Sequence, residues 1–255
     1  MALAELTIFS GALGMQTNVN VVIPTREFCD WQGMKEAEPK KPFKCLYLLH
    51  GLSDCFSTWL RRSSIERYAD RYGVCIVMPD GDKSFYTDMK YGLRYYTYIA
   101  KELPLLMNDM FNVSEKREDN FIAGLSMGGY GALKIGMREC DSFCAAAAFS
   151  AVADINSRKD SFRKELICAF GDEINIPETD DLFALSEKCD KNPNKPRIFM
   201  SVGYDDYMYE DNVRLKEHFE KLSFDYTYCE SDGAHTWEFW DEYIQRALEW
   251  MLDNE

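Results

Sequence analysis

Ser126 has the strongest chemical context of any residue in this chain. It lies in the glycine-rich segment 124–129, between an apolar run that predicts a strand and a run that predicts a helix. A serine in a sharp strand-to-helix turn, with small neighbours that leave room for a strained backbone, is typical of a nucleophile elbow. The free N–H groups at the start of the helix would favour developing negative charge. We therefore expect Ser126 to be a nucleophile, with a structural serine in a glycine-rich turn as the alternative.

A nucleophilic serine needs a general base, and the chain has three histidines. His218 lies on the charged side of the amphipathic segment 211–222, where we expect a solvated side chain. His50 ends a buried run before Gly51, where a role in shaping the loop is the better expectation. His235 lies in a loop of small residues after the last predicted strand, and α/β active sites form at such strand ends. We expect His235 to be the base, with helix capping as the alternative.

The third member of such a triad is a carboxylate that orients the imidazole and stabilises its protonated form. In the chain order Ser…Asp…His it lies between Ser126 and His235. Asp205 and Asp206 follow the apolar run 198–202 and are two adjacent candidates. Adjacent side chains point in different directions, so only one of them is expected to reach His235, and the local pattern leaves both open.

An oxyanion hole requires two backbone N–H groups that point at the reacting carbonyl oxygen. Met127 follows the nucleophile and supplies one of them in this kind of site. The loop after the apolar run 45–49 is the expected source of the other. Gly51 allows a close turn there, and the N–H group of Leu52 is the natural donor.

The elements that must position these residues follow the pattern of a mainly parallel sheet with helices on both faces. Residues 5–24 predict two antiparallel strands around a turn that contains Gly11 and Gly14. Apolar runs predict strands at 45–49, 74–78, 121–123, 143–150, 198–202 and 224–228, and helices are predicted at 57–72, 95–111, 129–137, 211–222 and 238–252. No linker or repeat interrupts this pattern. We therefore predict one α/β domain over residues 1–255.

Two segments carry a weaker pattern. A charged loop is predicted at 35–41, and residues 154–195 indicate an insertion with some helix that lies over the end of the sheet and covers a pocket. Its aromatic residues are candidates for the pocket lining, with simple core packing as an equal alternative: Phe162, Phe170 and Phe183. Four further aromatic residues lie near predicted strand ends and would suit an aromatic cleft: Trp59, Tyr86, Tyr207 and Trp237.

Composition and charge exclude several classes of protein. The chain has 29 Lys and Arg against 43 Asp and Glu, a net charge of −14, which disfavours nucleic acid and anionic membrane surfaces as partners. Nine cysteines form no Cys-x-x-Cys pair and only three histidines are present, so we expect no metal site. No signal-peptide pattern and no apolar stretch of about 20 residues is found. These features predict a reduced, cytoplasmic protein.

Five motifs occur in an order that resembles the esterase D group of α/β-hydrolases. They are His50-Gly51-Leu52-Ser53, the run from Met78 to Tyr86, Glu102-Leu103-Pro104, the run from Gly124 to Ala132, and the run from His235 to Asp241. The chain is most similar to small bacterial tributyrin esterases, with feruloyl esterases, acetyl-xylan esterases and S-formylglutathione hydrolases as relatives. The resemblance implies an α/β-hydrolase fold and a triad aspartate at Asp206, three residues after Gly203, with Asp205 in reserve.

Two positions depart from the pattern of that group. The loop around His235 reads Ala-His-Thr-Trp, where the group usually has Gly-His-Asp-Trp. His50 stands where S-formylglutathione hydrolases carry a serine, which disfavours that assignment.

The predicted function is a serine carboxylesterase that hydrolyses short-chain acyl esters through Ser126, His235 and Asp206 without a cofactor. The alternatives are a feruloyl or acetyl-xylan esterase, an S-formylglutathione hydrolase and, outside enzymes, a catalytically silent binding module of the same fold. The expected partner is a small ester, and the resemblance allows a homo-oligomer.

Overall fold

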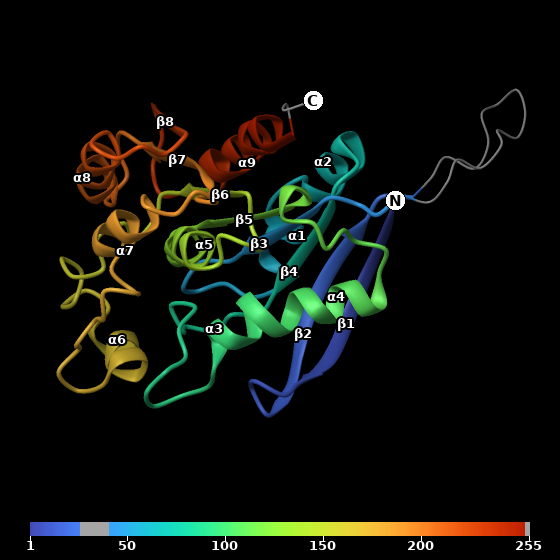
Figure 1. Ribbon diagram of the computed structural model, residues 1–255, viewed down its shortest axis with the longest axis horizontal. Helices are drawn as coiled ribbons and strands as arrows, with labels where there is room; N and C mark the ends of the chain where they lie inside the picture. Colours follow the sequence, from blue (N-terminus) through green and yellow to red (C-terminus); the bar gives the residue numbers. More distant parts are fainter. Residues whose placement is uncertain (26–40, 253–255) are drawn as a thin grey trace, which may run out of the picture.

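The computed structural model describes residues 1–25 and 41–252, so the predicted charged loop lies outside these ranges except for Lys41. Within them, eight strands form one sheet in the order β1-β2-β4-β3-β5-β6-β7-β8 (Figure 1). The strands are β1 (Ala2–Ser10), β2 (Met15–Ile23), β3 (Cys45–Leu49), β4 (Cys75–Pro79), β5 (Asn120–Leu125), β6 (Ala145–Phe149), β7 (Arg197–Gly203) and β8 (Tyr226–Ser231). β2 pairs antiparallel with β1 and β4, and all other neighbours are parallel. The α/β-hydrolase-like fold predicted from the sequence is confirmed.

The central strands are apolar throughout because both faces of the sheet are covered. In β3, Cys45, Tyr47 and Leu49 point into one core, whereas Leu46 and Leu48 point into the other. This alternation follows from the pleat of a strand, which directs successive side chains to opposite faces.

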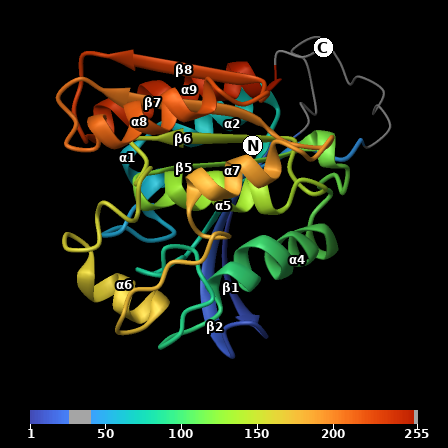
Figure 2. The same ribbon diagram turned by 60° about the vertical axis from the view of Figure 1, so that its left-hand side comes forward.

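Helices cover the two faces in two groups (Figure 2). One face carries α1 (Thr58–Arg62), α2 (Ile65–Tyr72) and α9 (Trp237–Leu252). The other carries α3 (Tyr95–Thr97), α4 (Leu103–Met110), α5 (Met127–Arg138), α7 (Leu182–Cys189) and α8 (Tyr209–Phe219). None of the helices in the described ranges is long and apolar enough to cross a membrane.

The helical segment predicted at 57–72 is present, but it is divided into two helices, α1 and α2. The chain leaves α1 at Ser63, whose hydroxyl and N–H group both donate to the carbonyl of Trp59. The N–H group of Ser64 then donates to the Asp241 carboxylate of α9 at 3.0 Å. A partner far away in the sequence therefore sets this break.

The helix predicted at 95–111 is present but changes its winding along its length. A π-helical turn, η1 (Tyr98–Glu102), joins α3 to α4. Before this turn, the hydroxyl of Tyr96 donates to the Glu139 carboxylate. After it, Leu103 and Met107 are buried in the core.

The predicted antiparallel hairpin is confirmed, with Ser10 opposite Met15 and Gly14 at a φ of 66°. Its turn is fixed by the Glu102 carboxylate at the end of η1. This carboxylate accepts the Ser10 hydroxyl at 2.5 Å and the N–H group of Gly11 at 2.6 Å.

Residues 154–195 contain α6 (Arg163–Phe170) and α7. Backbone hydrogen bonds from Lys90 and Tyr91 to carbonyls of α6 hold that helix against the loop that precedes α3. By contrast, α7 packs beside α5 and α8, and Figure 2 shows α6 apart from the sheet. The segment therefore joins two parts of the molecule, the loop before α3 and the helix α5.

Candidate active site

The turn between β5 and α5 has the geometry of a nucleophile elbow. Ser126 has φ 54° and ψ −118°, a left-handed conformation that non-glycine residues rarely adopt. A β-carbon on Gly124 would lie 2.4 Å from the carbonyl oxygen of Gly128, and one on Gly128 would lie 2.5 Å from that of Leu49. These glycines are therefore required by backbone contacts, which hold the serine in its strained conformation.

His235 and Asp206 form a hydrogen-bonded pair at the carboxyl end of the sheet. Nδ1 of His235 lies 3.0 Å from each Asp206 carboxylate oxygen. The carboxylate side chain is fully buried and also accepts the N–H group of Met208 at 2.8 Å. Because a carboxylate only accepts, Nδ1 carries the proton and Nε2 is left free to act as a base. Asp205, by contrast, is exposed, so of the two candidates Asp206 makes this contact.

A short chain of contacts links the serine side of the site to the histidine side. The N–H group of Ser126 donates to the Phe149 carbonyl, which places it beside Ser150 at the end of β6. The Ser150 hydroxyl accepts the indole N–H of Trp240 at 3.0 Å, and the Trp240 ring lies edge-on to His235 at 4.9 Å. In the part of the chain that the structure describes, the Ser126 hydroxyl makes no hydrogen bond with His235. Such catalytic bonds are often long in a ligand-free site and tighten when substrate binds.

The loop after β3 lies directly against the elbow, as an oxyanion hole requires. A β-carbon on Gly51 would lie 2.7 Å from the Leu125 side chain and 3.7 Å from Cβ of Ser126. Met127 begins α5, so its N–H group has no acceptor within the helix. Neither this group nor the N–H group of Leu52 donates a hydrogen bond to any described residue. Both groups are therefore available to a ligand.

His50 shapes the loop, as expected, and is not placed as a base. Its Nε2 accepts the Gly81 N–H group at 2.8 Å, so Nδ1 carries the proton and faces the Gly51 carbonyl at 2.7 Å. The Tyr86 hydroxyl donates to the His50 carbonyl at 2.8 Å. Tyr86 is fully buried, and so is Trp59, whose indole N–H donates to the Leu49 carbonyl. Both rings therefore support the loop from within, and the prediction that they line a cleft is wrong.

Tyr207 is the expected cleft residue that lies at the histidine. Its ring centre is 4.5 Å from that of His235, and the side chain is exposed. Trp237 is half-buried and packs against Trp59 and Trp240, and the Trp240 ring in turn contacts His235.

The prediction of a solvated His218 is wrong. Its Nε2 lies 3.0 Å from the Ser186 hydroxyl of α7, and its ring meets the Phe183 ring at 5.1 Å. Phe183 of α7 thus packs against α8, which is the core-packing alternative. Phe162 contacts the Phe85 ring at 5.5 Å.

A buried ion pair behind the site was not foreseen from the sequence. Lys134 of α5 has no exposed surface and donates to the Asp180 carboxylate at 2.8 Å, the Thr87 hydroxyl at 2.7 Å and the Phe85 carbonyl at 2.9 Å. Burial lowers the pKa of Lys134 to about 8, against the opposing effect of Asp180. The network holds the insertion and the strained turn at Phe85 on α5, the helix that follows Ser126. A lysine inside an otherwise apolar helix was the available signal.

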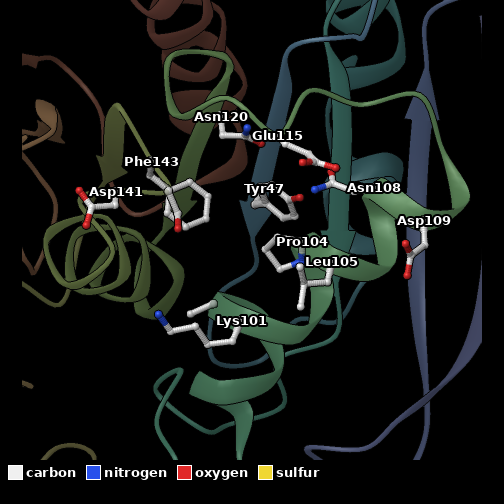
Figure 3. Close-up of a pocket in the computed structure, with 12 residues that line it drawn as sticks. Tyr47, Lys101, Pro104, Leu105, Asn108, Asp109, Glu115, Asn120, Asp141 and Phe143 are labelled. Atoms are coloured by element: carbon white, nitrogen blue, oxygen red, sulfur yellow. The ribbon is translucent and has the colours of Figure 1, made fainter.

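A pocket of about 470 Å³ lies at the opposite end of the sheet from Ser126, Asp206 and His235, between α4 and the starts of the central strands (Figure 3). Tyr47, Asn120 and Phe143 line it from the sheet side, and Lys101 and Pro104 from the helix side. It is separate from the candidate active site, which lies at the carboxyl ends of the strands.

Comparison with known proteins identifies the family of this chain. The Esterase family model matches residues 10–251, which is nearly the whole chain. The chain therefore belongs to the Esterase family of α/β-hydrolases, and it is a serine esterase that acts on carboxylic esters.

Individual relatives are similar over their full lengths. An acetyl esterase of Caldicellulosiruptor saccharolyticus is 31% identical, with 98% of each chain covered. The fluorophosphonate-binding serine hydrolase FphF of Staphylococcus aureus superposes with a TM-score of 0.89 at 33% identity, over 98% of both chains. The S-formylglutathione hydrolase FrmB of Staphylococcus aureus gives a TM-score of 0.85 at 33% identity, over 99% of this chain and all of that one.

Proposed function

We propose that this protein hydrolyses short-chain acyl esters, acetyl esters among them, with Ser126 as nucleophile, His235 as base and Asp206 as the orienting carboxylate. The observation that carries the proposal is the hydrogen-bonded pair of Asp206 and His235, which lies at the carboxyl end of the sheet, as does the strained turn at Ser126. The acetyl esterase relative supports the acyl length.

In the proposed reaction, Ser126 Oγ attacks the ester carbonyl carbon while His235 Nε2 takes the hydroxyl proton. Asp206 stabilises the imidazolium that results. The N–H groups of Leu52 and Met127 bind the oxyanion, and each such donor is worth about 3 kcal/mol in the transition state. The imidazolium protonates the leaving alcohol. Water, deprotonated by His235, then releases the acid from the acyl-enzyme.

The test is a set of initial rates on p-nitrophenyl acetate, butyrate and octanoate, methyl ferulate and S-formylglutathione. We expect kcat/KM to be highest on acetate or butyrate. The Ser126→Ala variant should keep its fold and lose turnover by about five to six orders of magnitude, because the residual rate comes from binding and the oxyanion hole. A near-normal rate in this variant would refute the assignment of the nucleophile.

S-formylglutathione is the second candidate substrate, and the similarity to the Staphylococcus aureus S-formylglutathione hydrolase favours it. The same rate series separates the two. If kcat/KM on the thioester exceeds that on every oxygen ester, this second function replaces the first while the roles of Ser126, His235 and Asp206 remain.

A further inference from the structure

Two buried thiols face each other where the insertion meets the nucleophile-bearing helix. Cys140 lies just after α5, and Cys189 is the last residue of α7. Their Sγ atoms are 3.4 Å apart, and the side chains are about 5% exposed. A disulfide requires an S–S distance of about 2 Å, which small side-chain movements would give from this starting point.

The surroundings of this pair suit thiol chemistry. Both cysteines line a pocket of about 350 Å³, together with Arg138 and Lys188, so a small oxidant can reach them. The hydrogen bond with Cys189 lowers the pKa of Cys140, while the same bond raises the pKa of Cys189. One sulfur is thus favoured as the thiolate and the other as the thiol, which is the arrangement of an attacking and a resolving cysteine.

A second pair of thiols in the same molecule provides a contrast. Cys45 and Cys75 are neighbours in the parallel register of β3 and β4, and both are completely buried. Burial raises the pKa of Cys45 well above its ordinary value. These two thiols are close together, but an oxidant cannot reach them, and burial disfavours the thiolate of Cys45.

We propose that Cys140 and Cys189 form a thiol–disulfide site that locks the insertion onto α5. With hydrogen peroxide as oxidant, the Cys140 thiolate attacks one peroxide oxygen and the O–O bond breaks. This gives a sulfenic acid on Cys140 and, after protonation, one water. The Cys189 sulfur then attacks Cys140 Sγ, the S–O bond breaks, and a second water leaves with the Cys189 proton. Two electrons pass from the two thiols to the peroxide, and one S–S bond forms.

The disulfide would be a covalent connection between the α5 region and the insertion, in addition to the Lys134–Asp180 ion pair. Both connections join α5 to the insertion, one through α7 and the other through the segment before it. The disulfide would close a loop between residues 49 positions apart in the sequence. It therefore restricts the unfolded chain and holds α7 in place.

The test is peptide mapping of the full-length protein under non-reducing conditions, after treatment with a small excess of hydrogen peroxide. We expect a crosslinked peptide that contains Cys140 and Cys189 and is lighter than the two peptides together by the mass of two hydrogen atoms. The Cys45 and Cys75 peptides should remain free thiols. Crosslinking elsewhere, or oxidation of Cys140 to sulfinic acid with no crosslink, would overturn the proposal.

A second measurement compares the thermal unfolding of the peroxide-treated protein with and without a reductant. Oxidation should raise the midpoint of the wild type by on the order of 5 °C, as a crosslink of this loop size does in a chain of this length. The rise should vanish in Cys140→Ser and in Cys189→Ser, and it should persist in Cys168→Ser, which removes an exposed thiol. An equal rise in all four proteins would also overturn the proposal.

Discussion

The elbow at Ser126 and the insertion at 154–195 are held in place by different means. The elbow is fixed by backbone against backbone: a β-carbon on Gly124 would clash with the Gly128 carbonyl, and one on Gly128 would clash with the carbonyls of Leu49 and His50. Two backbone hydrogen bonds hold α6, but the part of the insertion from Asp180 through α7 is fixed by side chains, chiefly the buried contact between Lys134 and Asp180 and the rings around Phe183.

This difference indicates which parts of the molecule tolerate amino-acid substitutions. Backbone contacts at van der Waals distance leave no room for any side chain, so the elbow is determined by a local glycine pattern. A buried ion pair can be replaced by apolar residues of similar size, provided that both partners change together. We therefore expect the catalytic geometry to be invariant and the insertion to be adjustable. Four predictions test this difference.

The largest expected effect follows from replacing Asp206 by asparagine. The asparagine carbonyl would accept the Met208 N–H group, so its amide N–H groups would face His235 Nδ1. The proton would then move to Nε2, which could no longer accept the serine proton. We expect kcat to fall about 10⁴-fold. Steady-state rates on p-nitrophenyl acetate measure this, with unchanged circular dichroism.

The matched control for this prediction is Asp205→Asn, next to it in the sequence but exposed. It should change kcat less than about two-fold, as surface substitutions usually do. If the two variants lost activity equally, the assignment of Asp206 would be wrong.

The second prediction concerns Lys134→Met, which leaves the Asp180 carboxylate buried without its nearest cation. We expect the free energy of unfolding to fall by about 3–5 kcal/mol. Urea unfolding measures this. The double variant with Asp180→Asn should recover part of the loss, since it removes a buried charge whose remaining cation is Arg138, 3.6 Å away.

Lys101→Met is the control, because Lys101 also pairs with a carboxylate, that of Glu139 just after α5, but is exposed. Its cost should be below about 1 kcal/mol. A cost as large as that of Lys134→Met would mean that burial does not distinguish the two pairs.

The third prediction concerns Gly128→Ala. A β-carbon there would lie 2.5 Å from the Leu49 carbonyl and 2.6 Å from that of His50, so the oxyanion loop must move. We expect a loss of about 1–3 kcal/mol in stability together with a marked fall in kcat. Gly136→Ala, later in the same helix, would also meet a neighbour, Ala146, but should leave kcat unchanged. Full activity in Gly128→Ala would contradict the close packing of the elbow.

The smallest effect is a dependence of stability on pH. Burial lowers the pKa of Lys134 to about 8 from 10.5, so between these values the unfolded chain binds more protons at this position than the folded chain. The free energy of unfolding should therefore rise with pH across this window, and the contribution is lost as the pH falls through about 8. The slope is at most about 1.4 kcal/mol per pH unit.

Measuring the difference between wild type and Lys134→Met at each pH isolates this contribution from other titrating groups. A difference that is flat across the window would show that Lys134 keeps its proton throughout.

The sequence predicted those parts of the site whose causes are local. Ser126 and His235 were singled out because glycine spacing and strand ends are visible in short windows, and the structure places them as a strained turn and as the partner of Asp206. The choice of Asp206 over Asp205 needed either the family resemblance or the structure, because burial separates the two.

Contacts between distant segments were not predictable. The break between α1 and α2 depends on Asp241, which is 177 positions from Ser64. The partner of Lys134 is 46 positions away in a segment without clear periodicity. Likewise His218 is half-buried only because α7 packs on α8, and no property of its own helix indicates this.

The π-helical turn η1 allows one continuous helical segment to contact different partners on its two sides. One additional residue in a turn shifts the angular phase of everything that follows by about 100° relative to a regular α-helix. Tyr96, before the turn, can thus face Glu139, while Leu103 and Met107, after it, face the sheet and Glu102 reaches the hairpin. Removing one residue from η1 would restore a uniform phase, and no single rotation of the helix could then satisfy both sets of partners.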